Sequence, residues 1–226
     1  MSSRHARFVV SIIGMLLGAS VNSMAAQASF DSSGASRINV SGADSSLIIT
    51  TDPSLPESVN ANVQGGSACR VSATAERTGD VVDVRIQRQG EHGRCTPVVR
   101  LNVREGLNLG VGLNAVTARL EGRYRGVSLM TQRADIDFNA QAEIIDLSAN
   151  ELNAYFRISP LRDTRLIRVK SDLADFRLQG DAESSLVYAI NARDADFSKG
   201  IPESASGTRL EISADALTGF TTPSNP

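Results

Sequence analysis

Apolar and polar residues alternate one by one through much of the first half of the chain. An alternation of period two is typical of β-strands that bury one face and expose the other to water. Glycine-containing turn signals separate the runs at residues 65–66, 78–80 and 90–93. The pattern therefore predicts antiparallel strands over residues 29–111. The apolar positions of the four clearest runs are Val59, Ala61 and Val63; Cys69, Val71, Ala73 and Ala75; Val82, Val84 and Ile86; and Val99, Leu101 and Val103.

Residues 112–220 carry a repeat. An apolar pair around one polar residue, ending in Leu or Phe, recurs every 18 to 23 residues, and a second such pair falls between these copies. Two interleaved ladders with a period of about 20 residues predict a parallel β-solenoid, in which short stacked rungs bury a continuous core. The first ladder comprises Ala118-Arg119-Leu120, Ile136-Asp137-Phe138, Ala154-Tyr155-Phe156, Ala174-Asp175-Phe176, Ala195-Asp196-Phe197 and the degenerate Thr218-Gly219-Phe220; the second comprises Val127-Ser128-Leu129, Ile145-Asp146-Leu147, Ile167-Arg168-Val169, Val187 to Ile190 and Leu210-Glu211-Ile212.

The polar residues inside these pairs point outward and predict two clusters. Asp137, Asp175 and Asp196 share one slot of the first ladder, and neighbouring rungs stand ~4.8 Å apart, so we expect an acidic strip. Three interpretations remain open: carboxylates that keep strand edges soluble, a Ca²⁺ site of oxygen ligands, or a carboxyl pair for glycoside hydrolysis. The first is favoured, because Arg177 and Arg193 lie close enough in the sequence to neutralise the strip.

The second ladder places Asp146 and Arg168 in the same outward slot of neighbouring rungs. Opposite charges directly across a pair of strands attract one another. We therefore expect these two side chains to lie within ion-pair reach.

Residues 1–28 have the features of a secretory signal peptide. Arg4, His5 and Arg7 form a basic start, and the apolar run from Phe8 to Leu17 is too short to span a bilayer, which needs about 20 residues. Ala26-Gln27-Ala28 fits the small-residue cleavage pattern. We expect an exported protein, periplasmic or extracellular, with no membrane span once the signal is removed.

The remaining chain is expected to form a single β domain over residues 29–220. Its last six residues, 221–226, are polar and contain two prolines. Such a segment packs poorly, so we expect a disordered tail there.

Cys69 and Cys95 are the only cysteines of the chain. Two lone cysteines of an exported protein usually pair. A disulfide is therefore favoured over a catalytic thiol, which a second thiol would trap, and over a zinc site, which would need two more ligands.

Charge and residue content narrow the function further. The chain has 23 basic and 25 acidic residues, and removal of Arg4 and Arg7 with the signal leaves 21 basic residues and a net charge of −4. This balance argues against a nucleic-acid binder, which needs a basic surface. His92 is the only histidine outside the signal, it lies in a loop, and no nucleophile elbow or phosphate-binding loop is present. No catalytic residue, metal or cofactor is assigned.

Two stretches resemble a known group of proteins. Arg37-Ile38-Asn39-Val40-Ser41-Gly42, followed by Leu47-Ile48-Ile49-Thr50, resembles the opening hairpin of bacterial adhesin-like β-strand-repeat proteins. The Val98–Val103 strand, with Leu113 to Leu120, Gly122 and Val127-Ser128-Leu129, resembles their transition into short rungs. The chain is similar in this respect to the auto-transporter adhesin head GIN domain families of uncharacterised exported proteins. The resemblance implies an all-β fold in the cell envelope, either a right-handed parallel solenoid or a hybrid of a β-sandwich and a solenoid, and it supplies no catalytic residues.

These features favour a non-enzymatic envelope protein, adhesin-like or structural, that binds another protein or a polysaccharide through its sheet faces. An exported carbohydrate-active enzyme on a β-helix is one alternative. A periplasmic partner of an envelope-stress system is another, which the resemblance alone suggests.

Overall fold

The computed structural model of the chain describes residues 26–30, 32–65, 70–89 and 95–224. It is almost entirely β-structure, and within these ranges no helix is long and apolar enough to cross a membrane. The elements are β1 (Ala26–Ser29), β2 (Arg37–Gly42), β3 (Ser45–Thr50), β4 (Ser58–Gly65), β5 (Arg70–Thr78), β6 (Val81–Gln89), β7 (Cys95–Asn102), β8 (Asn108–Gly112), β9 (Ala115–Met130), β10 (Arg133–Arg157), the 3-10 turn η1 (Leu161–Asp163), β11 (Leu166–Gly180), β12 (Leu186–Lys199) and β13 (Thr208–Pro223).

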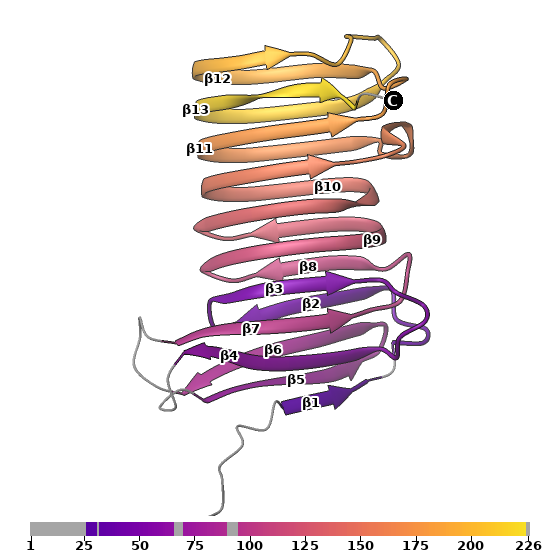
Figure 1. The fold of residues 1–226 in the computed structure, drawn as a ribbon, viewed down its shortest axis with the longest axis vertical. Helices are drawn as coiled ribbons and strands as arrows, with labels where there is room; N and C mark the ends of the chain where they lie inside the picture. Colours follow the sequence, from indigo (N-terminus) through magenta and orange to yellow (C-terminus); the bar gives the residue numbers. More distant parts are fainter. Residues whose placement is uncertain (1–25, 31, 66–69, 90–94, 225–226) are drawn as a thin grey trace, which may run out of the picture.

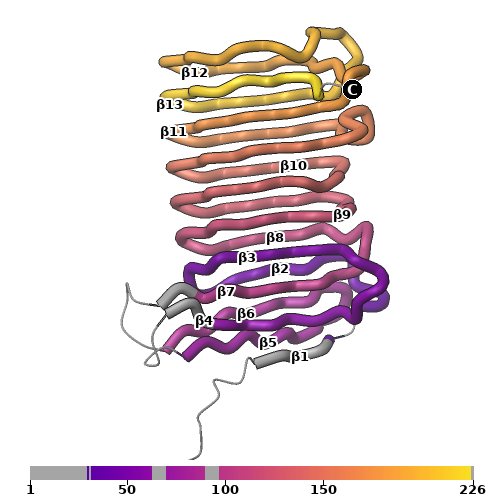
Figure 2. The backbone as a smooth tube through the Cα atoms, viewed as in Figure 1, coloured from indigo at the N-terminus to yellow at the C-terminus, as the bar shows by residue number. Residues whose placement is uncertain are grey.

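The long strands wrap around the molecule and contribute to two faces. Residues 116–120 of β9 pair with β3, whereas residues 126–130 of the same strand pair with β8. We call the side that contains β3 the first face and the side that contains β8 the second face. Figures 1 and 2 show the resulting flattened coils stacked along the long axis of the molecule. All strand pairs from β8 to β13 are parallel, which confirms the predicted solenoid-like all-β fold.

The N-terminal end mixes the two kinds of pairing. Antiparallel pairs join β1 to β4, β4 to β7 and β5 to β6, while β2 and β3 already run parallel to their neighbours. The prediction of antiparallel strands throughout residues 29–111 is therefore wrong for β2, β3 and β8, which pair in parallel as the later rungs do. Among the described residues, the alternating positions predicted to face inward are buried or partly buried: Val59, Val84 and Val99, for example, are fully buried. Strand β1 includes residues 26–28, which the sequence assigns to the end of the signal peptide.

The core is a continuous stack of inward side chains. Phe138, Phe156 and Phe176 are fully buried, and both ring-to-ring centroid distances along this series are 5.2 Å. Tilted rings at this distance add to the free energy gained by burying their area. Phe197 continues the series at 6.5 Å from Phe176 and is only partly buried, because β12 lies at the open end of the stack.

The order of the last rungs differs from their order along the chain. The sheet runs β10-β11-β13-β12, so β13 lies between two rungs that precede it in the sequence (Figure 1). Gly219 of β13 lies opposite both Phe176 and Phe197. Its φ is +138°, and a Cβ at this position would clash with the Phe176 carbonyl. Glycine is therefore needed at a position where both neighbouring rungs have an inward phenylalanine.

Two sequence-based predictions about the repeat are wrong. Phe220 does not occupy the inward slot: it lies opposite Arg177 and its exposed fraction is 39%. The chain is also not a loose tail from residue 221 onward, because β13 runs to Pro223 and Thr221 is buried. The Thr221 hydroxyl accepts hydrogen bonds from the backbone N–H groups of Gly200 and Ile201, at 3.1 and 3.2 Å, and these bonds hold the strand in place.

Removing one ring from the buried stack should destabilise the fold strongly. We expect Phe156→Ala to lower the free energy of unfolding by about 3–5 kcal/mol, because it leaves a cavity between two rungs. Met130→Ala is the matched control: the exposed fraction of Met130 is 72%, and its truncation should change stability by no more than about 0.5 kcal/mol. Urea unfolding followed by circular dichroism measures both. Equal small effects would show that the ring stack does not carry the fold.

Candidate binding groove

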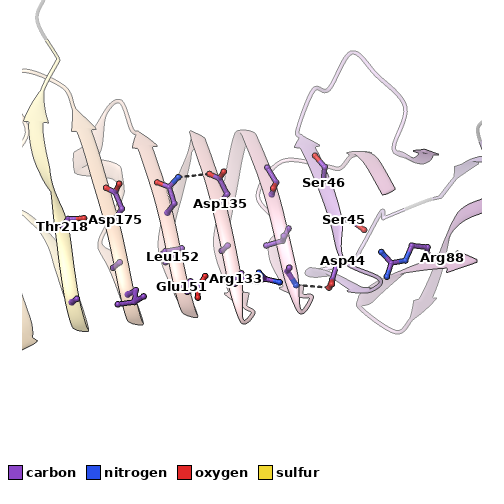
Figure 3. A pocket seen from close by; sticks show the side chains of 18 residues that line it. Asp44, Ser45, Ser46, Arg88, Arg133, Asp135, Glu151, Leu152, Asp175 and Thr218 are labelled. Atoms are coloured by element: carbon purple, nitrogen blue, oxygen red, sulfur yellow. Dashed lines mark hydrogen bonds between the residues drawn. The ribbon is translucent and has the colours of Figure 1, made fainter. Parts of the chain in front are cut away.

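Six outward residues of the first face form one column along the solenoid axis. Strand pairing aligns Ser46 with Thr117, Thr117 with Asp135, Asn153 with Asp175, and Asp175 with Thr218. Asn153 joins the two halves of this series, since its amide Nδ2 donates to Asp135 Oδ1 at 3.3 Å. We call these residues the polar column; it comprises Ser46, Thr117, Asp135, Asn153, Asp175 and Thr218. Figure 3 labels four members of the column, Ser46, Asp135, Asp175 and Thr218, each on a different strand.

The polar column lies along a shallow groove with a volume of about 750 Å³. A neighbouring outward column, with Arg133, Glu151 and Leu173, lines the same groove. Leu173 is an exposed apolar residue within it, with an exposed fraction of 53%. At the N-terminal end the groove reaches Asp44, whose carboxylate accepts a hydrogen bond from the Ala115 N–H at 2.9 Å (Figure 3).

A further outward column borders the groove with larger side chains. It runs through Arg119, Asp137, Tyr155 and Arg177. The Arg157 guanidinium donates to Asp137 Oδ1 at 2.6 Å and lies 5.1 Å from the centre of the Tyr155 ring. These contacts fix the ring beside the column and leave it half-buried.

The column offers hydrogen-bond donors and acceptors in every rung. Serine and threonine hydroxyls and the asparagine amide both donate and accept, whereas the aspartates accept only. Arg177 Nη2 donates to Asp175 Oδ2 at 2.7 Å, which satisfies part of that carboxylate. Neighbouring rungs stand ~4.8 Å apart, so the column spans about 24 Å. The arrangement suits an extended ligand with many hydroxyl groups.

The three aspartates predicted to form an acidic strip do not lie side by side on successive rungs. Asp137 lies in the Arg119 column and forms an ion pair with Arg157, so it does not align with Asp175. Asp175 and Asp196 do share a column, but Thr218 of the inserted strand β13 separates them. Of the two arginines expected to neutralise the strip, Arg177 contacts Asp175 while Arg193 contacts Asp215 at 3.7 Å.

The sequence reasoning missed Thr117, Asp135 and Asn153 because it misaligned one rung. The loop at residues 158–165, which contains η1, lengthens that turn of the coil, so Asn153 aligns with Asp175 and Phe156 with Leu178, 22 residues on. The second ladder already contained this signal, since Ile145 and Ile167 are 22 residues apart. Two ladders on one coil must advance by the same number of residues per turn.

The structure brings Asp146 and Arg168 together on the second face. Arg168 Nη1 lies 3.4 Å from Asp146 Oδ2, and its Nε donates to Glu211 Oε2 at 2.9 Å on the other side. The hydrogen bond from Arg168 is the main reason why the pKa of Glu211 lies below its usual value; partial burial opposes this shift, and Arg209 adds to it. Because β13 pairs with β11, Glu211 lies directly opposite Arg168 on the next rung.

The remaining predicted residues lie outside the described part of the chain. This applies to Cys69, to the side chain of Cys95 and to His92. The expected disulfide stays a prediction. In the part that is described, no group of three or more His, Cys, Asp and Glu side chains is arranged to hold a metal ion.

Comparison with known proteins identifies no family model and no curated protein that matches the chain. Two solved structures are similar to it along most of its length. One is a protein from Clostridium sporogenes whose name assigns it to cell adhesion, with 9% identity, a TM-score of 0.40, and coverage of 88% of this chain and 98% of that one. The other is a protein from Bacteroides fragilis named as an adhesin, with 10% identity, a TM-score of 0.46, and coverage of 89% and 96%. At these values, function has to be argued from the groove itself.

Removing the Arg168 side chain should change the titration of Glu211. Because the pKa of Glu211 is lower in the folded chain than in the unfolded chain, its hydrogen bonds stabilise the fold at neutral pH, and this contribution is lost as the pH falls through the folded-state pKa. We expect Arg168→Gln to raise that pKa toward its ordinary value, as measured by carboxyl NMR titration. Arg193→Gln is the control and should leave Glu211 unchanged. An unshifted Glu211 in Arg168→Gln would contradict the assigned cause.

Proposed function

We propose that the chain is an exported, non-enzymatic protein that binds a linear polysaccharide along the polar column. The observation that carries the proposal is the column itself: hydroxyl, carboxylate and amide groups at one rung intervals on the floor of a groove of about 750 Å³. Export is supported by the sequence of residues 1–28, which has the order of charge, apolar run and small residues of a signal peptide.

A linear polymer fits the shape of the groove better than a small molecule does. The groove is shallow and extends over successive rungs, from Asp44 near β3 to Thr218 in β13. A small ligand would contact one or two rungs and stay largely exposed, whereas binding sites for small molecules are usually deep enough to bury most of the ligand. A polymer parallel to the solenoid axis would meet the same kind of polar group at every rung.

A polysaccharide fits the chemistry of the groove better than a polypeptide does. The floor is the middle of a sheet, so the backbone groups are already paired and no strand can be added there. Peptide recognition would then depend on separate deep pockets for its side chains, whereas the groove is one shallow channel with a polar side chain in every rung. Hydroxyl groups can both donate to Asp135 or Asp175 and accept from Asn153, while Leu173 and Tyr155 offer apolar surface to the faces of sugar rings.

Hydrolysis of the polymer is the alternative, since Asp135 and Asp175 face the same groove. Two rungs separate them, about 9.6 Å, which is at the upper limit for an inverting pair of carboxyl groups. Both carboxylates are engaged by neighbours, however: Asp135 by Asn153, and Asp175 by Arg177. Asn153 also lies between them, where the scissile bond would have to sit. These contacts favour binding over cleavage.

Blocking the centre of the column should weaken binding. We would screen dextran, hydroxyethylcellulose, alginate and chitosan by affinity gel electrophoresis, and then measure Kd for the polymers that retard the protein by titration calorimetry. We expect Asn153→Arg, which fills the groove midway along the column, to weaken binding by about tenfold or more. Ser128→Arg is the matched control: Ser128 is an outward polar residue on the second face, and its variant should bind as the unmodified chain does.

Three results would count against the proposal. Retardation by none of the polymers would contradict the assigned ligand class, and equal affinity of Asn153→Arg and the unmodified chain would contradict the assigned surface. Release of reducing ends from a bound polymer, lost in Asp135→Asn and Asp175→Asn, would replace binding by hydrolysis.

A further inference from the structure

The last strand of the chain occupies a slot between two earlier rungs. On one side of β13, its residues 209–223 pair with residues 166–180 of β11. On the other side, its residues 208–221 pair with residues 186–199 of β12. Both pairings are parallel, so β13 receives backbone hydrogen bonds along both of its edges (Figure 1). β12 lies beyond it at the end of the stack.

The two strands that flank the slot share part of their inward pattern. Through β13, Phe176 is aligned with Phe197 and Asp175 with Asp196. Both strands therefore carry the tripeptide Ala-Asp-Phe at the same place in the register. Since Gly219 has no side chain, the Phe176 and Phe197 rings already approach to 6.5 Å across the intervening strand. If β13 left the slot, β12 could therefore close onto β11 in the same register and keep its inward side chains buried.

Strand β13 is joined to the rest of the fold only through the loop at residues 200–207. A small latch holds the two together. The Thr221 hydroxyl accepts from Gly200 N–H and Ile201 N–H, and it shares a hydrogen bond of 2.7 Å with the Tyr188 hydroxyl. The Tyr188 hydroxyl also contacts the Ile201 carbonyl at 2.8 Å.

We propose that the slot between β11 and β12 accepts β13 from a second copy of this chain, so that two copies exchange their last strands. The contacts that β13 makes with β11 and β12 within one chain are available to the β13 of another, including the hydrogen bond between Arg168 and Glu211. The latch contacts of Thr221 with Gly200 and Ile201 lie in the connecting loop, which has to open during the exchange. Exchange of an identical element between copies therefore adds no new interface, and its free-energy difference from the closed monomer is small. Transient pairing of β12 with β11 would lower the free energy of the intermediate in which β13 has left the slot.

The exchange brings two polar columns into one assembly. Linked binding sites engage a polymer more tightly than either site alone, because the second contact is intramolecular. This consequence rests on the proposed function, whereas the exchange itself does not.

Cysteines placed on either side of the slot would test the exchange. We would prepare full-length Arg168→Cys with one affinity tag and full-length Glu211→Cys with another, mix them, and then oxidise them. Residues 168 and 211 face each other across paired strands, ~4.8 Å apart, which is within the range for a disulfide. Exchange predicts a time-dependent disulfide-linked heterodimer that pull-down with both tags recovers. Tagged chains without either substitution give the background from Cys69 and Cys95.

The matched control uses the same ladder one rung earlier. Asp146 and Arg168 face each other across β10 and β11, which cannot exchange without unfolding everything that follows them. Separate Asp146→Cys and Arg168→Cys chains should give no heterodimer above background. Both pairs are also made within one chain, to show that each disulfide can form. If both form within one chain, and the mixed Arg168 and Glu211 chains give no more heterodimer than the control mixture, the proposal is overturned.

The latch supplies a second test that does not depend on cysteine geometry in the slot. Thr221→Val removes the hydroxyl and keeps the shape, so release of β13 should be roughly tenfold faster, as expected for the loss of the hydrogen bonds that this hydroxyl makes with Gly200, Ile201 and Tyr188. Thr218→Val, at an outward position of the same strand, should leave the rate unchanged. Exchange is followed by mixing copies that carry two different fluorophores. Equal rates for the two variants would contradict the assigned role of the latch and with it this route of exchange.

Discussion

Stacking of buried side chains between successive rungs is the interaction on which the other features of the molecule depend. Each rung buries few apolar residues by itself, and the solenoid gains its core only when the inward residues of neighbouring rungs meet. The Phe138, Phe156 and Phe176 rings do so at 5.2 Å. Since inward and outward residues alternate, a register fixed by the core also fixes which outward residues align. The polar column is thus a consequence of how the core packs.

The interesting positions are those where the chain departs from its repeat. The loop at residues 158–165 lengthens one turn of the coil, and this aligns Asn153 with Asp175 on the first face. The late insertion of β13 places Thr218 between Asp175 and Asp196, and Glu211 beside Arg168. Both irregularities leave the apolar stack continuous while they change the outward chemistry. In such a fold, surface properties can change at the corners without loss of the core.

The sequence was sufficient to predict the fold class and much of the core, because period-two alternation and the repeat report directly on which residues face inward. It was not sufficient for the site. Phe156 and Phe176 look like successive copies, but they occupy neighbouring inward columns, and only the spacing of Ile145 and Ile167 shows this. No local sequence pattern predicts the position of β13. The roles of Gly219 and Thr221 become clear only from their contacts with Phe176, Gly200 and Ile201, which are distant in the sequence. Long-range order of strands is a property of packing that no single rung encodes.

The dependence of affinity on ligand length tests the central claim most directly. The account holds that one polymer chain lies along the column through consecutive rungs, so each added sugar should gain contacts until the ligand spans about 24 Å. Calorimetric titration with a size-fractionated series of oligosaccharides from the polymer that binds best would measure this. We predict that affinity rises steadily with length and then reaches a plateau once the column is filled. An affinity that is already constant from the disaccharide upward would place recognition at a single rung and contradict the account.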